Sequence, residues 1–195
     1  ALSSEALGLK ETATLLSAVL TPDLLRHPCC EDKEGTERLF SSSRILWNYC
    51  VAYTNDLLTG VTEQSLVPHG LTKSLEQQRE AAKQVTLLRS IAADLLEYCL
   101  SDHITISDAQ IALSFTSKVA CLYHEEGDFE KAATMFARAS KYCDIVRQHI
   151  SLTNNDENHS EASANTQLLL SQLFDLLATE ASNAWHLSDI DRCHL

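Results

Sequence analysis

Two segments with apolar residues at helical spacing, joined by a Gly-Asp pair, constrain the fold of this chain more than any other sequence feature. They run from Val119 to Ala139, and the pair is Gly127-Asp128. A glycine after a helix adopts the left-handed conformation that ends it, and an aspartate can cap the helix that follows. Small and aromatic residues flank the pair at helical spacing. The residues that define this predicted pair of closely packed helices are Ala120, Tyr123, Gly127, Ala132, Phe136 and Ala139.

The order of these residues resembles one tetratricopeptide repeat (TPR), a helix pair that stacks on its neighbours with a period of about 34 residues. Two positions depart from the usual pattern, since Thr116 stands where the family most often has Trp and Asp144 where it often has Pro. The resemblance implies neighbouring helices, because one helix pair cannot bury its apolar faces alone. We therefore expect an all-α fold, a TPR-like helical-hairpin solenoid that winds as a right-handed superhelix.

A second helix of this kind is predicted from Gln167 to His186, with an apolar stripe that ends at Trp185. The turn after it, Ser188-Asp189-Ile190, aligns with Gly127-Asp128-Phe129. A polar insertion, residues 154–165, separates it from the first repeat. The chain then runs only a few residues into the partner helix. We expect the chain to be a fragment of a longer array, with its last repeat truncated.

Three further helical patterns precede the repeat, and each is marked by its own periodicity and punctuation. They span Ser3 to Leu20, Phe40 to Leu58 with an end near Thr59-Gly60, and Ser74 to Leu100. The stretch Pro28 to Gly35 is predicted as a loop, and Ser107-Asp108 as the cap of the first repeat helix. The predicted organisation is a divergent N-terminal helical region, residues 1–106, followed by TPR-like repeats, residues 107–195, in one continuous solenoid.

Composition and charge exclude several classes of partner. The 195 residues are 45% hydrophobic with 5 Gly and 3 Pro, which suits a helical domain that buries a core. No apolar run approaches the ~18 to 20 residues that cross a bilayer. A formal net charge of −12 opposes binding to phosphate backbones, which requires clustered Lys and Arg. We expect neither a membrane-embedded protein nor direct contact with nucleic acid.

The seven cysteines contain no Cys-x-x-Cys pair, so we predict reduced, mostly buried thiols in an intracellular reducing compartment. His27 with Cys29-Cys30 is the one cluster with metal-ligand chemistry, but adjacent cysteines suit tetrahedral geometry poorly. His124 is interpreted as part of the polar end of a helix. No phosphate loop, nucleophile elbow or metalloprotease motif is present. We predict no catalytic residue, metal or cofactor; a thiol or metal enzyme stays as an alternative.

In a stacked TPR array the first helices of the pairs line a concave groove, where partners bind. On the helix from Gln110 to His124, and on the one from Gln167 to His186, the polar residues predicted to face this groove are Ser114, Ser117, Lys118, Ser171, Asp175 and Ser182. Trp47 has two interpretations, a groove anchor or a core residue. Large aromatic residues on an apolar helical stripe usually pack inward, which favours the core.

Four features, taken in order, resemble the N-terminal part of the meiotic Zip-four or sporulation-specific twenty-two family of TPR scaffolds. They are Leu46-Trp47-Asn48, the helix around Leu87 to Leu96, the repeat from Val119 to Ala139, and the helix from Leu168 to Trp185. The resemblance implies a nuclear, chromosome-associated, non-enzymatic scaffold. It would assemble the synaptonemal complex and promote crossovers by binding chromosome-axis or recombination proteins. The alternative is a general TPR adaptor that binds a partner peptide in its groove, although the chain is poor in groove Lys and Asn for a carboxylate clamp.

Overall fold

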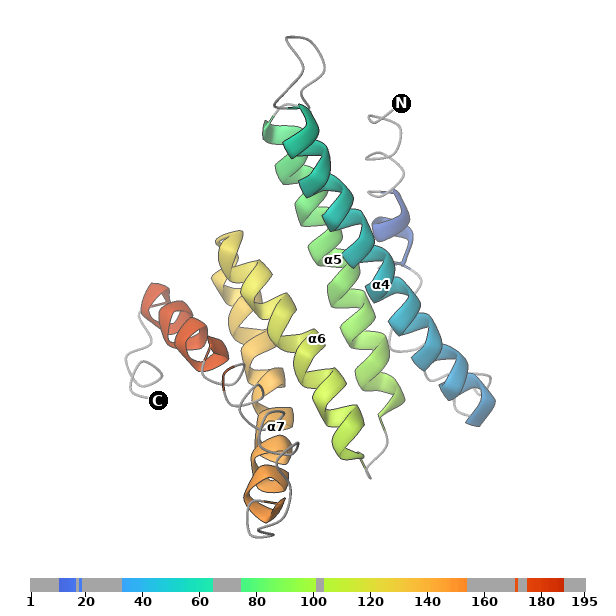
Figure 1. Ribbon diagram of the computed structural model, residues 1–195, viewed down its shortest axis with the longest axis vertical. Coiled ribbons are helices and arrows are strands. Elements are labelled where there is room, and N and C mark those ends of the chain that lie inside the picture. The colour runs from blue at the N-terminus through green and yellow to red at the C-terminus, as the bar shows by residue number, and fades with distance from the viewer. Residues whose placement is uncertain are drawn as a thin grey trace. The chain divides into compact units, whose positions relative to one another are not determined.

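The computed structural model describes residues 11–16, 18, 33–64, 75–100, 104–153, 171 and 175–187. Within these ranges the fold is all-α and contains no strand. The long helices are α4 (Lys33–Gln64), α5 (Leu75–Cys99), α6 (Ile106–Glu125) and α7 (Phe129–Thr153), with shorter helical segments at 11–16 and 175–186 (Figure 1). The chain forms two compact units, Ala1–Cys99 and Leu100–Leu195. Among the described helices, none combines the length and the apolar character that a membrane span requires.

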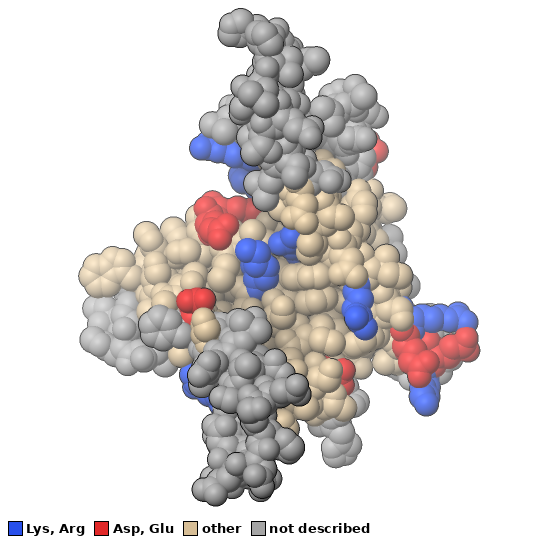
Figure 2. Space-filling model, in the orientation of Figure 1, with Lys and Arg blue, Asp and Glu red and all other residues tan. Residues whose placement is uncertain are grey.

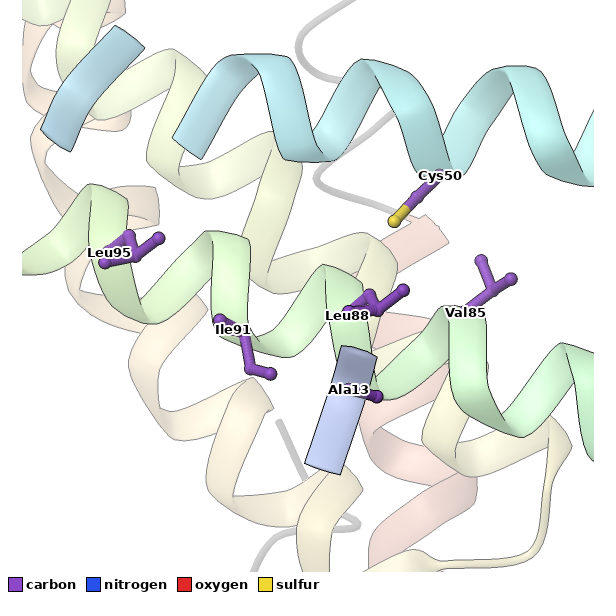
Figure 3. Close-up of a cluster of buried hydrophobic side chains, with 6 residues drawn as sticks. All are labelled: Ala13, Cys50, Val85, Leu88, Ile91 and Leu95. Atoms are coloured by element: carbon purple, nitrogen blue, oxygen red, sulfur yellow. The ribbon is translucent and has the colours of Figure 1, made fainter. Parts of the chain in front are cut away.

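Unit 1 is built on an antiparallel hairpin of α4 and α5 (Figure 1). The two helices approach closely where Ser43 Oγ donates a buried hydrogen bond of 2.7 Å to the carbonyl of Ala92. Side chains from the 11–16 segment, α4 and α5 meet in one apolar cluster, shown in Figure 3. Its buried members are Ala13, Cys50, Val85, Leu88, Ile91 and Leu95. The helical periodicity that the sequence shows in α5 is therefore the periodicity of this core.

Helix α4 is longer at both ends than the sequence predicts. It begins at Lys33, so the loop prediction is wrong for residues 33–35, and it passes through Gly60 to end at Gln64. Its first turns carry two charge pairs one turn apart, Glu34 with Arg38 and Lys33 with Glu37, which favour a helical start. An interior glycine costs a helix only about 1 kcal/mol, and a helix once formed extends easily. Gly60 therefore does not end it.

A buried arginine lies between α4 and α5. The guanidinium of Arg89 is 5.4 Å from the ring centroid of Trp47, and its Nη2 donates to Thr54 Oγ1 at 3.2 Å. Burial lowers the pKa of Arg89 below its usual value. Trp47 is only half-buried and packs against this cation inside unit 1. The aromatic ring thus partly replaces the water that the guanidinium loses.

Unit 2 contains the predicted helix pair as the antiparallel hairpin of α6 and α7. Gly127 has φ 80, the left-handed conformation that the sequence predicted. The Asp128 amide donates to the Tyr123 carbonyl at 2.9 Å and the Gly127 amide to the His124 carbonyl at 3.0 Å, which is a Schellman motif. Asp128 Oδ1 then accepts from the Lys131 amide at 3.3 Å. One three-residue turn therefore ends α6 and caps α7.

The N-terminal cap of α6 differs from the predicted one. Thr105, and not Ser107, is the cap residue, and its hydroxyl oxygen accepts from the Asp108 amide at 3.2 Å. Its hydroxyl hydrogen is donated to Asp108 Oδ2 at 2.6 Å. Both Thr105 and Ser107 have the chemistry of a cap, so the choice depends on where the backbone turns.

The interface between α6 and α7 is made of small and aromatic residues. Of the six predicted packing residues, five are buried: Ala120, Tyr123, Ala132, Phe136 and Ala139. Thr116 is fully buried and satisfies its hydroxyl on the Ala112 carbonyl at 2.7 Å. With Asp144 in place of a proline, α7 continues to Thr153. These two departures from the TPR pattern are therefore compatible with a packed helix pair.

Several sequence predictions concern residues outside the described ranges. These are most of the Ser3 to Leu20 pattern, the cluster of His27 with Cys29-Cys30, the polar insertion 154–165, most of the stretch from Gln167 to Phe174, and the Ser188-Asp189-Ile190 turn.

Candidate partner-binding site

The predicted groove residues of α6 lie on its exposed side. Ser114 and Lys118, one helical turn apart, are exposed, and Ser117 between them is half-buried. Ser117 Oγ donates to the Ser114 carbonyl at 3.3 Å. A hydroxyl bonded back to its own helix is less available to a partner than a solvated one. Lys118 is therefore the one charged and exposed side chain among the three predicted groove residues of this helix.

The predicted groove residues of the following helix are also exposed. Asp175 and Ser182 stand two turns apart on the segment 175–186, and Ser171 is exposed in a helical position before it. Residues seven apart in a helix share a face, so Asp175 and Ser182 belong to one side. That side faces α6, because Ser182 Oγ lies 3.5 Å from His124 Nε2.

The Cys121 thiol marks where α6 and the segment 175–186 come together. Burial raises the pKa of this thiol, while a hydrogen bond from Thr179 and the charge of Lys118 lower it. The carboxylates of Glu125 and Asp175 act in the opposite direction. Lys118 and Asp175, two of the predicted groove residues, thus both act electrostatically on this thiol.

A polar and aromatic cluster, here called the turn cluster, joins the segment 175–186 to the α6–α7 turn. Its members are His124, Phe129, Asn183 and His186. Asn183, only 1% exposed, donates from Nδ2 to the Phe129 carbonyl at 3.0 Å and lies 3.1 Å from His124 Nδ1 through its Oδ1. The ring of His186 stacks on Phe129 with centroids 4.4 Å apart and planes 4° apart. Residues from three helices thus meet at one turn.

The hydrogen bonds of the turn cluster define the tautomer of His124. Asn183 Nδ2 is committed to the Phe129 carbonyl, so the atom that faces His124 is Oδ1, which only accepts. Nδ1 of His124 must therefore carry the proton. Nε2 lies 3.5 Å from the Ser182 hydroxyl, a group that can donate or accept.

Sequence reasoning missed the turn cluster. His124 lies in the last turn of α6, at the helix end where the sequence predicted it, but it is half-buried and bonded to Asn183. One signal was present: Asn183 interrupts an apolar stripe at the position seven residues after Leu176, where a core residue is expected. A polar residue on an apolar face usually has a specific partner, because burying it unpaired is costly.

The cysteines and potential metal ligands within the described ranges bear on the alternative of a thiol or metal enzyme. The four described cysteines are reduced, with Cys50 and Cys143 buried and Cys99 and Cys121 half-buried. Burial raises the pKa of Cys50 to about 11, which keeps its thiol protonated at neutral pH. No group of three His, Cys, Asp or Glu side chains within the described ranges is arranged to hold a metal ion. In the view of Figure 2, basic and acidic side chains are interspersed among uncharged surface.

No protein-family model matches the sequence. No curated protein and no solved structure is significantly similar to it. The candidate site is defined by the contacts around Cys121 and the turn cluster.

Proposed function

We propose that this chain is a non-enzymatic protein–protein interaction scaffold built from TPR-like helical hairpins. One observation carries the proposal: a third helix packs on the α6–α7 hairpin through Asn183, which bonds both to the end of α6 and to the start of α7. In a helical-hairpin array the first helix of each pair packs on the preceding pair in this manner. The buried small residues of α6 and α7 support the same interpretation.

The partner segment would bind along the exposed sides of α6 and the segment 175–186. Lys118 and Asp175 there offer charges of opposite sign, and Ser114 and Ser182 offer hydroxyls. An extended or helical peptide with complementary charges gains specificity from such a strip, while its apolar side chains supply affinity. The proposed mechanism is recognition by position and charge on a preformed helical surface.

The resemblance to the meiotic Zip-four or sporulation-specific twenty-two family narrows this proposal. On that basis the partners are chromosome-axis or recombination proteins, the site of action is the nucleus, and the role is synaptonemal complex assembly and crossover formation. The alternative is a general TPR adaptor that binds one partner peptide in its groove. The two functions differ in where the partner is found: the partner of a meiotic scaffold is present in meiotic cells, whereas the partner of a general adaptor is also present in other cells.

The test is affinity capture with the full chain from meiotic extract, compared with extract from dividing non-meiotic cells. Chromosome-axis or recombination proteins should be enriched from the meiotic extract, and Lys118→Glu should reduce their recovery. Lys141→Glu, the same charge reversal at an exposed position of α7, is the matched control and should leave recovery unchanged. Capture that is equal from both extracts supports the general adaptor. Capture insensitive to Lys118→Glu contradicts the groove.

A further inference from the structure

The side of α4 that points away from α5 is unusually apolar for an exposed surface. Ile45 is 69% exposed and Tyr49, one turn later, 52% exposed. We call this surface the outer face of α4; its residues, all exposed, are Arg44, Ile45, Asn48, Tyr49, Val51 and Ala52. Single exposed apolar residues are common, but a contiguous group on one helix marks an interaction surface.

The outer face is also depleted of charge. Between Leu39 and Asn55 the only charged residue is Arg44, although the whole chain has a net charge of −12. No acidic side chain among the described residues forms an ion pair with Arg44. Protein interfaces show this composition, with Tyr and Arg enriched and Lys, Glu and Asp depleted at their centre. An exposed arginine on such a face favours a carboxylate on the partner.

Packing on the outer face favours a helical partner. Tyr49 stacks on Tyr53, with ring centroids 6.3 Å apart and planes at 25°, so its ring is held in place before binding. An anchor that is already ordered loses little entropy when it binds. Asn48 and Ala52, one turn apart, have short side chains that let a second helix approach between the larger residues.

We propose that the outer face of α4 docks a helix from another protein, one that presents apolar side chains one turn apart and a carboxylate opposite Arg44. This inference goes beyond the proposed function and is independent of it, because the outer face lies in unit 1 and the groove residues lie in unit 2. A second copy of the chain is the less suitable occupant. Two chains of net charge −12 repel each other, and the face itself offers no carboxylate.

The proposal is tested with a displayed library of helical peptides of about four turns, selected on the full chain and counter-selected on the Ile45→Glu variant. The expected consensus has apolar residues at i and i+3 or i+4 and one Asp or Glu. Selection on Arg44→Glu should replace that acid by Lys or Arg. A consensus without an acid, or one that Arg44→Glu leaves unchanged, overturns the proposal.

Fluorescence anisotropy with one selected peptide measures how much each substitution weakens binding. Ile45→Glu should weaken binding about tenfold or more, as expected for an apolar anchor, and Arg44→Glu about fivefold. Lys118→Glu and Lys141→Glu should leave the affinity unchanged, which separates this face from the unit 2 groove. Sedimentation of the chain alone tests whether the face binds a second copy. A dimer that Ile45→Glu abolishes would assign the outer face to that copy and overturn the proposal.

Discussion

His124 and Asn183 are 59 residues apart in the sequence, yet their side chains lie 3.1 Å apart across the α6–α7 turn. Asn183 also bonds the backbone of Phe129, so one amide group joins the end of α6, the start of α7 and the helix that follows. This amide, and not the surrounding apolar stripe alone, positions the segment 175–186. An apolar contact permits sliding and rotation, whereas two hydrogen bonds of fixed direction do not.

We predict that Asn183→Ala loosens the segment 175–186. The change removes both hydrogen bonds of a side chain that is only 1% exposed, and each such bond contributes about 0.5–1.5 kcal/mol. Hydrogen exchange across 175–186 should accelerate, and the melting temperature should fall. The control is Ser182→Ala, because its exposed hydroxyl makes only the 3.5 Å contact with His124. Equal effects of the two variants would contradict the special role of the amide.

Gly127→Ala should destabilise the α6–α7 hairpin by about 1 kcal/mol, because alanine pays a steric penalty at positive φ. A Cβ at this position meets no atom within 4 Å, so the penalty comes from the backbone and not from a clash. Gly35→Ala, inside α4, should instead raise the stability, since alanine is the better helix former there. Denaturant unfolding of both variants measures the two effects, and a stabilised Gly127→Ala would refute the left-handed assignment.

The two candidate caps of α6 can be separated by substitution. Thr105→Ala should cost about 1 kcal/mol, because the Asp108 amide loses its acceptor. Ser107→Ala lies inside the first turn and should change stability by less than about 0.5 kcal/mol. Thermal unfolding followed by circular dichroism distinguishes these outcomes. A larger effect at Ser107 would restore the cap that the sequence predicted.

Cys50 should make the stability of the protein depend on pH in the alkaline range. Its pKa rises from 9.0 to about 11 on folding because burial disfavours the thiolate. Above pH 9 the unfolded chain loses this proton while the folded chain keeps it, so stability falls as pH rises from 9 toward 11. Cys50→Ala should flatten this part of the curve of unfolding free energy against pH. Ser42→Ala, at an exposed position of the same helix, should leave the slope unchanged.

The sequence by itself determined the helices of the α5 to α7 region and the turn between α6 and α7. Periodicity of apolar residues is a local property, and Gly127 and Asp128 act through bonds to residues within five positions of them. For the same reason the all-α class and the small buried residues Ala120, Ala132 and Ala139 followed from the pattern. Whether such helix pairs continue as a TPR-like array stays a prediction.

Only the tertiary structure decided the rest. In the structure Thr105, and not Ser107, caps α6, and α4 continues through Gly60. Ile45 and Trp185 are exposed, although they lie on helices whose patterns suggested burial. The tertiary structure also brought Asn183 to His124. These outcomes depend on which elements meet in space, and on whether a neighbour covers a given face. Local sequence supplies the groups that can bond or be buried, and distant residues select among them.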